Sequence, residues 1–148
     1  MVQWTRVVTE NATGSAGPLS LWRVTGVDLN LHAAFTTRTG GVSRPPYETL
    51  NLGGSVGDDP ESVRENRRRL LRSLPPGVPR SVQTVKQVHG TDVIRVDGPR
   101  GEQEPLDWWV GPPADAMMAR RPAVHLAVFA SDCLPVYVVD PVGGGGRA

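Results

Sequence analysis

The sequence predicts one globular domain that contains one well-marked helix and several β-rich runs, and its length, composition and that helical segment support this. The chain has 148 residues, enough for one domain with its own core. Hydrophobic residues make up 39% of the chain and charged residues 21%, which is typical of a soluble globular protein. A helix start and an apolar helical stripe both occur in residues 59–74, whereas the other apolar runs are short and rich in β-branched residues.

The charge balance excludes a broad electrostatic surface for nucleic acid or for an anionic membrane. The 16 Lys and Arg residues nearly match the 15 Asp and Glu residues, so the formal net charge is +1. The single cysteine cannot form an internal disulfide, which favours a reducing compartment. The first ten residues lack the apolar stretch of a signal peptide, and no later run is long enough to span a bilayer. We therefore expect a cytoplasmic protein that binds neither nucleic acid nor membrane.

The first half of the chain predicts two strands followed by a long loop. A short N-terminal strand precedes the polar loop 10–18 (ENATGSAGP), and Leu29 to Thr37 (LNLHAAFTT) form the next strand. Residues 38–60 are then dense in Gly, Pro, Ser and Asn. A loop of this length is unusual inside a compact domain, and such loops are often functional.

A helix is predicted to begin after Asp59, which is a good N-cap, with Pro60 at its first position. Residues 75–77 (PPG) are expected to end it. Several arginines near its end complement the helix dipole or are solvated, which explains them better than a phosphate site does. The apolar side chains follow one helical stripe, formed by Val63, Leu70, Leu71 and Leu74.

The second half of the chain predicts further strands. Residues 81–88 (SVQTVKQV) and 93–97 (VIRVD) are β-rich and joined by HGTD, which predicts a hairpin with His89 at its turn. Residues 98–113 are expected to form a loop that Trp108 and Trp109 pin to the core. A buried strand is predicted from Ala123 to Ala130. Pro135 should then bend the chain near Cys133 before the strand resumes from Val136 to Val139.

The chain lacks the sequence motifs of several common enzyme classes. The segment GGSVGDD precedes the helix but lacks the lysine and hydroxyl residue of a phosphate-binding loop, and its aspartates would repel an anion. No G-x-S-x-G, H-E-x-x-H or C-x-x-C is present. The candidates for chemistry are polar residues at the ends of predicted elements: Arg38, Asn51, His89, Asp132 and Cys133.

Two of these residues suit a metal ion. Taken alone, His89 is better explained as a turn residue, and Cys133 as a small buried hydrophobe. Together, an imidazole and a thiolate suit zinc, provided that the fold brings the turn to the strand end. A thiolate beside a cation or an imidazolium is also an activated nucleophile. The spacing of the two residues leaves these alternatives open.

Three blocks of the chain resemble, in order, the laccase-domain or polyphenol oxidase family, which is YfiH-like and includes purine nucleoside phosphorylases and peptidoglycan editing factors. The blocks are residues 35–70, residues 87–93 (QVHGTDV) and residues 114–141, which contain ADAMM and LAVFASDCLPVYVVDP. The combination of T-R-x-G-G-V-S, Q-V-H-G and D-C-x-P is far more specific than any one of these motifs. The chain has Ser-Asp-Cys where the family usually has Ala-Asp-Cys.

The resemblance implies an α+β fold with mixed β-sheets and helices outside, of which residues 1–148 would be the N-terminal portion of a single domain without its C-terminal part. It also implies a catalytic zinc with His89 and Cys133 as ligands. The family's third ligand is a histidine in a later H-A-G-W-R-G block that this sequence lacks, so we expect the chain alone to be inactive and to bind zinc weakly. Along a straight strand, His125 would lie roughly 26 Å from Cys133, too far to replace that ligand. His32 is not excluded.

The activity that the resemblance implies is phosphorolysis of purine nucleosides, including adenosine, inosine and methylthioadenosine, with adenosine deamination alongside. Phosphate would be the co-substrate, and Cys133 and Asp132 would be catalytic. The position of Arg38 and Asn51 in the Gly-rich loop, together with their chemistry, makes them our candidates for contacts with substrate or phosphate. One alternative is an amidohydrolase that edits a cell-wall precursor; another is a catalytically silent fragment or a metal-binding interaction module. Copper oxidase chemistry fits poorly, because multicopper centres need more than the three histidines present. The oligomeric state is left open.

Overall fold

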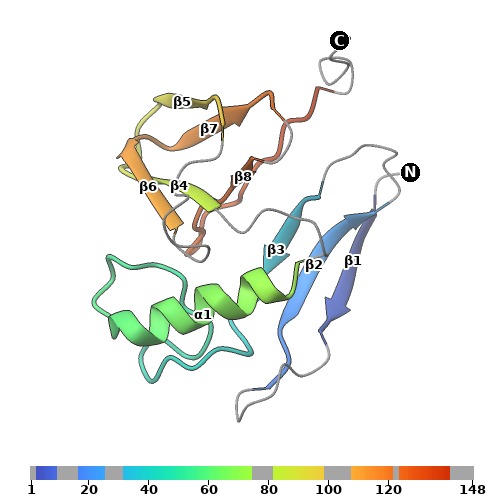
Figure 1. Cartoon of the computed structure of the whole chain (residues 1–148), viewed down its shortest axis with the longest axis vertical. Helices are drawn as coiled ribbons and strands as arrows, with labels where there is room; N and C mark the ends of the chain where they lie inside the picture. The colour runs from blue at the N-terminus through green and yellow to red at the C-terminus, as the bar shows by residue number, and fades with distance from the viewer. Residues whose placement is uncertain are drawn as a thin grey trace. The chain divides into compact units, whose positions relative to one another are not determined.

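The computed structural model describes residues 3–9, 17–25, 32–74, 82–98, 108–121 and 124–140. These residues form a mixed α+β structure with small sheets and one helix, as expected (Figure 1). The chain divides into two compact units, Met1–Pro75 and Pro76–Ala148. No helix among the described residues is both long enough and apolar enough to cross a bilayer.

The first unit contains an antiparallel sheet of three strands in the order β1-β2-β3. These are β1 (Gln3–Val8), β2 (Ser20–Thr25) and β3 (Ala34–Thr36). The N-terminal strand is confirmed. The strand predicted from Leu29 to Thr37 is shorter, since its described part is regular only in β3, and residues 29–31 lie outside the described part of the chain.

Helix α1 (Pro60–Arg72) confirms the predicted start. The Asp59 carboxylate accepts hydrogen bonds from the Ser62 backbone N–H at 2.9 Å and from its hydroxyl at 2.8 Å, which caps the first turn. Ser73 closes the other end, since its N–H donates to helix carbonyls. The predicted stop at residues 75–77 lies outside the described residues.

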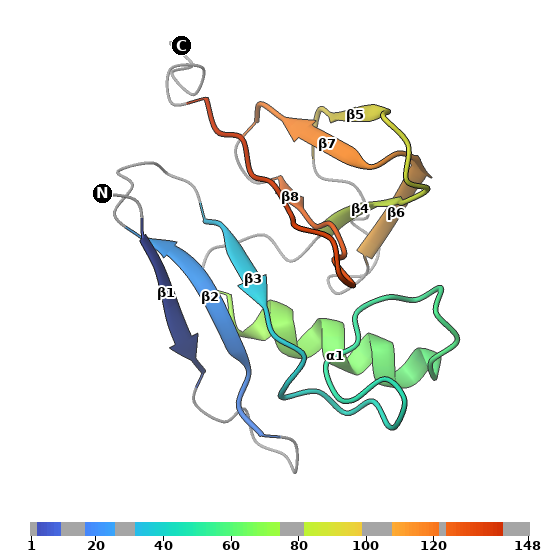
Figure 2. The ribbon, with the colours of Figure 1, turned by 180° about the vertical axis from the view of Figure 1, so that it is seen from behind.

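The core of the first unit lies between the sheet and the helix. Both views of the ribbon show α1 beside the β1–β3 sheet (Figures 1 and 2). Leu19, Leu21 and Leu50 form its buried cluster, and Leu52 and Leu70 pack against it. The apolar stripe predicted for the helix therefore faces the core at Leu70.

The long loop before the helix is confirmed, and it is held by one buried side chain. Asn66 of α1 has no exposed surface. Its Oδ1 accepts from the Val42 N–H at 2.8 Å, and its Nδ2 donates to Ser43 Oγ at 2.8 Å. The same Nδ2 donates to the carbonyls of Asn51 at 2.8 Å and Thr49 at 3.1 Å. One amide on the helix thus organises a loop that has no regular structure of its own.

Two adjacent glycines allow this loop to fold tightly. A Cβ on Gly41 would lie 2.0 Å from the Thr49 carbonyl oxygen, so any side chain there would clash with backbone. Gly40 has a φ of 89°, a left-handed conformation that only glycine adopts without strain. The Gly-Gly pair in the first family-like block is therefore explained by backbone packing.

The second unit is built from parallel strands. In one sheet, β4 (Val82–Lys86) lies between β6 (Trp108–Pro113) and β8 (His125–Leu126), and it pairs in parallel with both. In the other sheet, β5 (Val93–Val96) pairs in parallel with β7 (Ala116–Ala119).

The predicted hairpin between residues 81–88 and 93–97 is wrong. Both strands exist, but β4 and β5 belong to different sheets. Four consecutive residues of β4 are buried, which is typical of a central parallel strand covered on both faces. Short separation along the chain therefore did not decide the pairing, because β4 pairs with strands from much later in the sequence.

The loop predicted for residues 98–113 is also partly wrong, because it contains β6. Trp108 is buried there, and its ring stacks on Phe129 with centroids 5.9 Å apart, so the expected pinning of this segment to the core is confirmed for that residue.

The apolar segment at residues 123–139 forms less strand than predicted. Of the strand predicted from Ala123 to Ala130, only His125 and Leu126 are in β8, and residue 123 lies outside the described residues. Residues 131–133 bend, as expected from Pro135, but Val136 to Val139 form no strand and are exposed. The β8 ladder to β4 has only two register pairs, and an apolar sequence forms a regular strand only where a partner strand supplies the hydrogen bonds.

Candidate active site

The candidate residues of the second unit follow the carboxyl ends of its parallel sheet. Strand β4 runs into His89, β6 runs into Asp115, and β8 leads toward Asp132 and Cys133. Parallel strands place their carboxyl ends at one edge of a sheet, and ligands of open parallel sheets commonly bind outside that edge. The topology therefore directs the candidate residues of this unit to one edge.

The turn that carries His89 is held by a carboxylate from the next segment of the sheet. Asp115 accepts backbone hydrogen bonds from Gly90 at 2.7 Å, His89 at 3.0 Å and Val88 at 3.1 Å. His89 has a φ of 59°, so its backbone is left-handed, as in a tight turn. The Gly90 N–H, together with those of His89 and Val88, holds the pKa of Asp115 below its usual value although partial burial acts in the opposite direction.

A second contact joins the His89 segment to the Cys133 segment. The Gln87 side chain donates through Nε2 to the Phe129 carbonyl at 2.9 Å, and its Oε1 accepts from the Phe129 N–H at 2.7 Å. Just before it, the Ala127 N–H donates to the Gln83 carbonyl at 2.9 Å. The Gln87 amide thus continues the pairing of β4 beyond the strand itself, between the Q-V-H-G block and the block that contains Cys133.

Cys133 lies exposed in a bend, so its interpretation as a buried hydrophobe is wrong. Its Sγ lies 3.8 Å from Oδ1 of Asp132, within reach of a weak S–H hydrogen bond. Asp132 is exposed as well. An acceptor beside the sulfur can take up the thiol proton when a cation replaces it.

No three His, Cys, Asp or Glu side chains gather into a metal site among the described residues, so the structure does not assemble a site around His89 and Cys133. His89 is exposed at its turn, as its interpretation as a turn residue predicts. His125 lies in β8 opposite Val82, the first residue of β4, and therefore away from the carboxyl edge. The metal role of His89 and Cys133 stays a prediction.

The substrate candidates Arg38 and Asn51 lie in the long loop of the first unit. The Arg38 side chain is 74% exposed; its Nε donates to the Glu48 carbonyl at 2.8 Å, and its Nη2 lies 3.7 Å from the Glu48 carboxylate. The Asn51 amide donates to Asp58 at 2.9 Å and accepts from the Gly53 N–H at 3.0 Å. Asn51 is therefore largely engaged in holding the loop, whereas Arg38 presents its guanidinium to solvent. Substrate contact by either residue stays a prediction.

Sequence reasoning missed two residues that organise these segments. Asn66 occupies the apolar stripe of α1, three residues after Val63, where a polar side chain signals a buried hydrogen-bond partner. Asp115 stands between two alanines in the ADAMM segment, directly between β6 and β7. A charged residue between two short strands could have indicated that its carboxylate binds backbone N–H groups of a turn.

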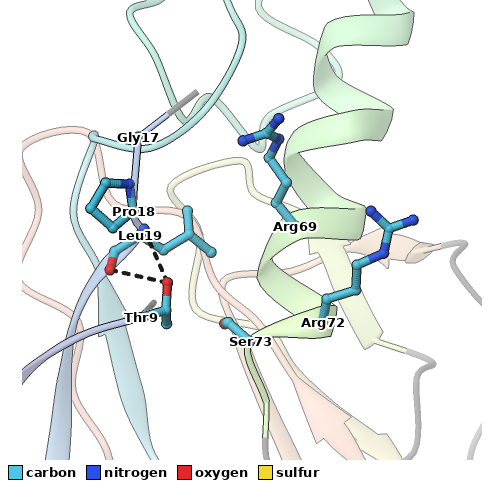
Figure 3. Close-up of a pocket in the computed structure, with 7 residues that line it drawn as sticks. All are labelled: Thr9, Gly17, Pro18, Leu19, Arg69, Arg72 and Ser73. Atoms are coloured by element: carbon cyan, nitrogen blue, oxygen red, sulfur yellow. Dashed lines mark hydrogen bonds between the residues drawn. The ribbon is translucent and has the colours of Figure 1, made fainter. Parts of the chain in front are cut away.

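The first unit also has a shallow pocket of about 250 Å³ at the end of α1 (Figure 3). Arg69 and Arg72 line it, but Arg69 is paired with Glu65 at 3.1 Å. The carbonyl end of a helix carries partial negative charge, which disfavours an anion and favours basic side chains. The helix dipole therefore explains both arginines without a ligand. The lining residues are Thr9, Gly17, Pro18, Leu19, Arg69, Arg72 and Ser73.

Curated relatives resemble most of this chain. It is 47% identical over 123 residues to a protein named purine nucleoside phosphorylase ORF3 from Streptomyces griseus, covering 82% of this chain and 47% of that protein. It is 40% identical over 111 residues to purine nucleoside phosphorylase YfiH of Escherichia coli, covering 75% of this chain and 42% of that protein. The chain thus spans about half the length of the curated relatives it matches.

A solved structure and a family model agree with these relatives. YlmD from Geobacillus stearothermophilus superposes with a TM-score of 0.61 at 28% identity, covering 95% of this chain and 50% of that one. The model for the family described as multi-copper polyphenol oxidoreductase laccase matches residues 32–145. Because that match includes most of the sequence and the relatives are so similar, the chain belongs to this family.

Proposed function

We propose that this chain provides part of the active site of a zinc-dependent purine nucleoside phosphorylase, with His89 and Cys133 as two of the zinc ligands. The observation that carries the proposal is that segments bearing these two residues leave the carboxyl edge of one parallel sheet and are joined by the Gln87 side chain. Membership of the family, and the names of the relatives from Streptomyces griseus and Escherichia coli, support the activity.

The donor set fits zinc. An imidazole and a thiolate are common zinc ligands, and both side chains are exposed and accessible to an ion. When bound, zinc would polarise a substrate oxygen or lower the pKa of a water molecule. The family resemblance supplies the third ligand, a histidine, from a block that this sequence does not contain.

The proposed reaction is phosphorolysis. A phosphate oxygen forms a bond to C1′ of the ribose, the bond between C1′ and N9 of the purine breaks, and the base leaves with a proton as ribose 1-phosphate forms. The exposed Arg38 guanidinium suits bidentate phosphate binding. Asp132 is the proposed group that moves the proton, because its carboxylate is exposed and lies beside the proposed zinc ligand Cys133. Adenosine, inosine and methylthioadenosine are the proposed nucleosides, with deamination of adenosine as a second activity.

The test is release of adenine from adenosine in the presence of zinc. The chain alone should release none, whereas a chimera that adds the unmatched part of the Streptomyces griseus relative should release adenine and ribose 1-phosphate only when phosphate is present. His89→Ala and Cys133→Ala in the chimera should abolish the release. A folded, zinc-loaded chimera that releases no adenine with phosphate would contradict the proposal, and ammonia release would report deamination separately.

Arg38 is tested in the same chimera. Arg38→Ala should raise KM for phosphate about tenfold or more while changing KM for adenosine much less, because a charge-assisted hydrogen-bond pair to phosphate is lost. Arg68→Ala is the matched control, since Arg68 is a partly exposed arginine of the same unit that pairs with Glu65 on the helix surface. Equal effects of Arg38→Ala on both substrates would remove this residue from the phosphate role.

A further inference from the structure

Asp115 is the residue on which the His89 turn depends. We propose that Asp115 is a positioning residue, whose carboxylate fixes the backbone of residues 88–90 so that the His89 imidazole is presented to the metal. The inference rests on the proposed function, in which His89 is a zinc ligand. It differs from the usual arrangement, in which a carboxylate binds the second nitrogen of the histidine ring, because here the carboxylate binds the backbone.

The geometry requires a turned backbone. In an extended strand, successive N–H groups point in opposite directions, so three of them cannot meet one carboxylate. Here Oδ1 accepts from Val88 at 3.1 Å and from His89 at 3.0 Å, and Oδ2 accepts from Gly90 at 2.7 Å. The left-handed φ of His89 makes this convergence possible, and such a concave set of N–H groups binds an anion.

Asp115 is itself held from two sides, so the turn is attached to the sheets and not to a loose loop. The preceding residue, Ala114, is fully buried, and its N–H donates to the Lys86 carbonyl of β4 at 3.1 Å. The N–H groups of Asp115 and Ala116 donate to the Asp92 carbonyl at 3.2 Å and 3.3 Å, just before β5. A functional side chain supported by rigid elements keeps its geometry better than one on an isolated loop.

The chemistry demands an acid at this position. A carboxylate only accepts, with two oxygens for three donors, and its charge strengthens each bond. An asparagine has nearly the same shape, but its NH₂ group would face the N–H of Gly90 or of His89. Neither ring nitrogen of His89 has a hydrogen bond to another described residue, so the backbone is fixed while the ring stays available for a ligand.

The first test is Asp115→Asn in the 148-residue chain without metal. Amide hydrogen exchange at residues 88–90 should accelerate at least tenfold, while exchange at residues 83–85 in β4 should not change. Asp92→Asn is the matched control. It removes a charge from the loop that carries His89, but Asp92 binds Asp115 and Ala116 through its backbone carbonyl, which the substitution keeps. Unchanged exchange at residues 88–90 in Asp115→Asn would overturn the positioning role, whatever zinc does.

The second test is the zinc affinity of the chimera described above, followed by NMR titration of the His89 and Cys133 signals. Asp115→Asn should weaken zinc binding about 10-fold to 100-fold, the usual effect of losing a residue that supports a metal ligand, and Asp92→Asn should change it less than twofold. In a His89→Ala background, Asp115→Asn should cause no further loss, since its effect runs through His89. An equal loss in that background indicates general destabilisation and contradicts the proposal. A wild-type chimera whose His89 and Cys133 signals do not change when zinc is added would overturn the proposed function instead.

Discussion

His89 and Cys133 both have exposed side chains on backbone that other residues hold. The His89 turn is bound by Asp115, and the chain leading to Cys133 is bound at Phe129 by the Gln87 amide. Neither side chain fills space in a core. Because neither side chain packs in a core, both are available to bind a ligand without disturbing the fold.

The corresponding prediction is that His89→Ala and Cys133→Ala in the chimera leave the protein folded but lower its zinc affinity to a weak, still measurable value. Exposed side chains leave no cavity, so the free energy of unfolding should change by no more than about 0.5 kcal/mol. Isothermal titration with zinc and urea unfolding measure the two quantities. Arg95→Ala, at an exposed position of β5, is the control and should keep wild-type affinity. A variant of His89 or Cys133 with unchanged zinc affinity would disprove its assignment as a ligand.

At the scale of elements, helix α1 orders both its own start and the loop before it. Asp59 caps the helix, and Asn66 holds the loop from the buried face. The backbone N–H groups of Thr49 and Leu50 donate to the Arg38 carbonyl within the same loop. The conformation of the loop that carries Arg38 therefore depends on the helix being folded.

The cap should make helix stability depend on pH. Hydrogen bonds from the Ser62 hydroxyl and N–H hold the pKa of Asp59 below its usual value. Because the pKa of Asp59 is lower in the folded state, the ionised cap stabilises the fold fully above the pKa of an unfolded aspartate, about 3.9. This stabilisation is lost as the pH falls through the folded-state pKa. Asp59→Ala should therefore destabilise more at pH 7 than at pH 2.5, and Asp59→Asn should keep the cap while removing that pH dependence. Urea unfolding at both pH values checks this; an Asp59→Ala effect that is equal at both would contradict it.

Asn66 should be among the most sensitive positions of the first unit. Asn66→Ala leaves the Val42 N–H and several loop oxygens without their buried partner, so the free energy of unfolding should fall by about 1–3 kcal/mol. Asn66→Asp keeps the acceptor but turns a carboxylate toward three oxygens, and should be at least as damaging. Arg68→Ala, on the solvated face, is the control with a change below about 0.5 kcal/mol. Urea unfolding measures the free energy of unfolding of all three variants. If Asn66→Ala lowered it as little as the control does, Asn66 would not be the residue that holds the loop.

At the scale of the whole molecule, apolar side chains after Cys133 are exposed to solvent. Val138 is 91% exposed and Leu134 is 86% exposed, and their neighbours Val136 and Tyr137 are exposed as well. A continuous exposed apolar segment of this kind promotes association. These residues form no strand, in contrast to the strand predicted from Val136 to Val139.

Replacing this segment's valines should therefore improve solubility without a loss of stability. The double variant Val136→Thr/Val138→Thr should slow aggregation, as measured by light scattering at fixed concentration, and should leave the free energy of unfolding within about 0.5 kcal/mol. Val85→Thr makes the same chemical change at a buried position of β4 and should destabilise by about 1–3 kcal/mol, because a hydroxyl is buried. A large stability loss in the double variant would show that these side chains are packed in solution.

The sequence alone determined the features that depend on neighbouring residues. The Asp59 cap, the Pro60 start, the irregular loop at residues 38–59 and the bend near Pro135 all follow from local backbone chemistry, and the structure has them. The ordered motifs predicted the family, which the comparisons confirm. Candidate site residues at the ends of elements could also be named, since polar residues there are rarely needed for packing, and their roles stay predictions.

Tertiary structure decided which strands pair and what holds the candidate site. The local sequence predicts a hairpin of residues 81–88 and 93–97, whereas β4 pairs in parallel with residues 108–113 and 125–126. Local sequence does not distinguish these pairings, because strand pairing depends on which distant segment buries the apolar face of the strand. For the same reason Asp115 was missed: it meets the Gly90 N–H from 25 residues away. The contacts that shape the turn join segments far apart in the chain, and only the folded arrangement of the sheet brings their donors and acceptors together.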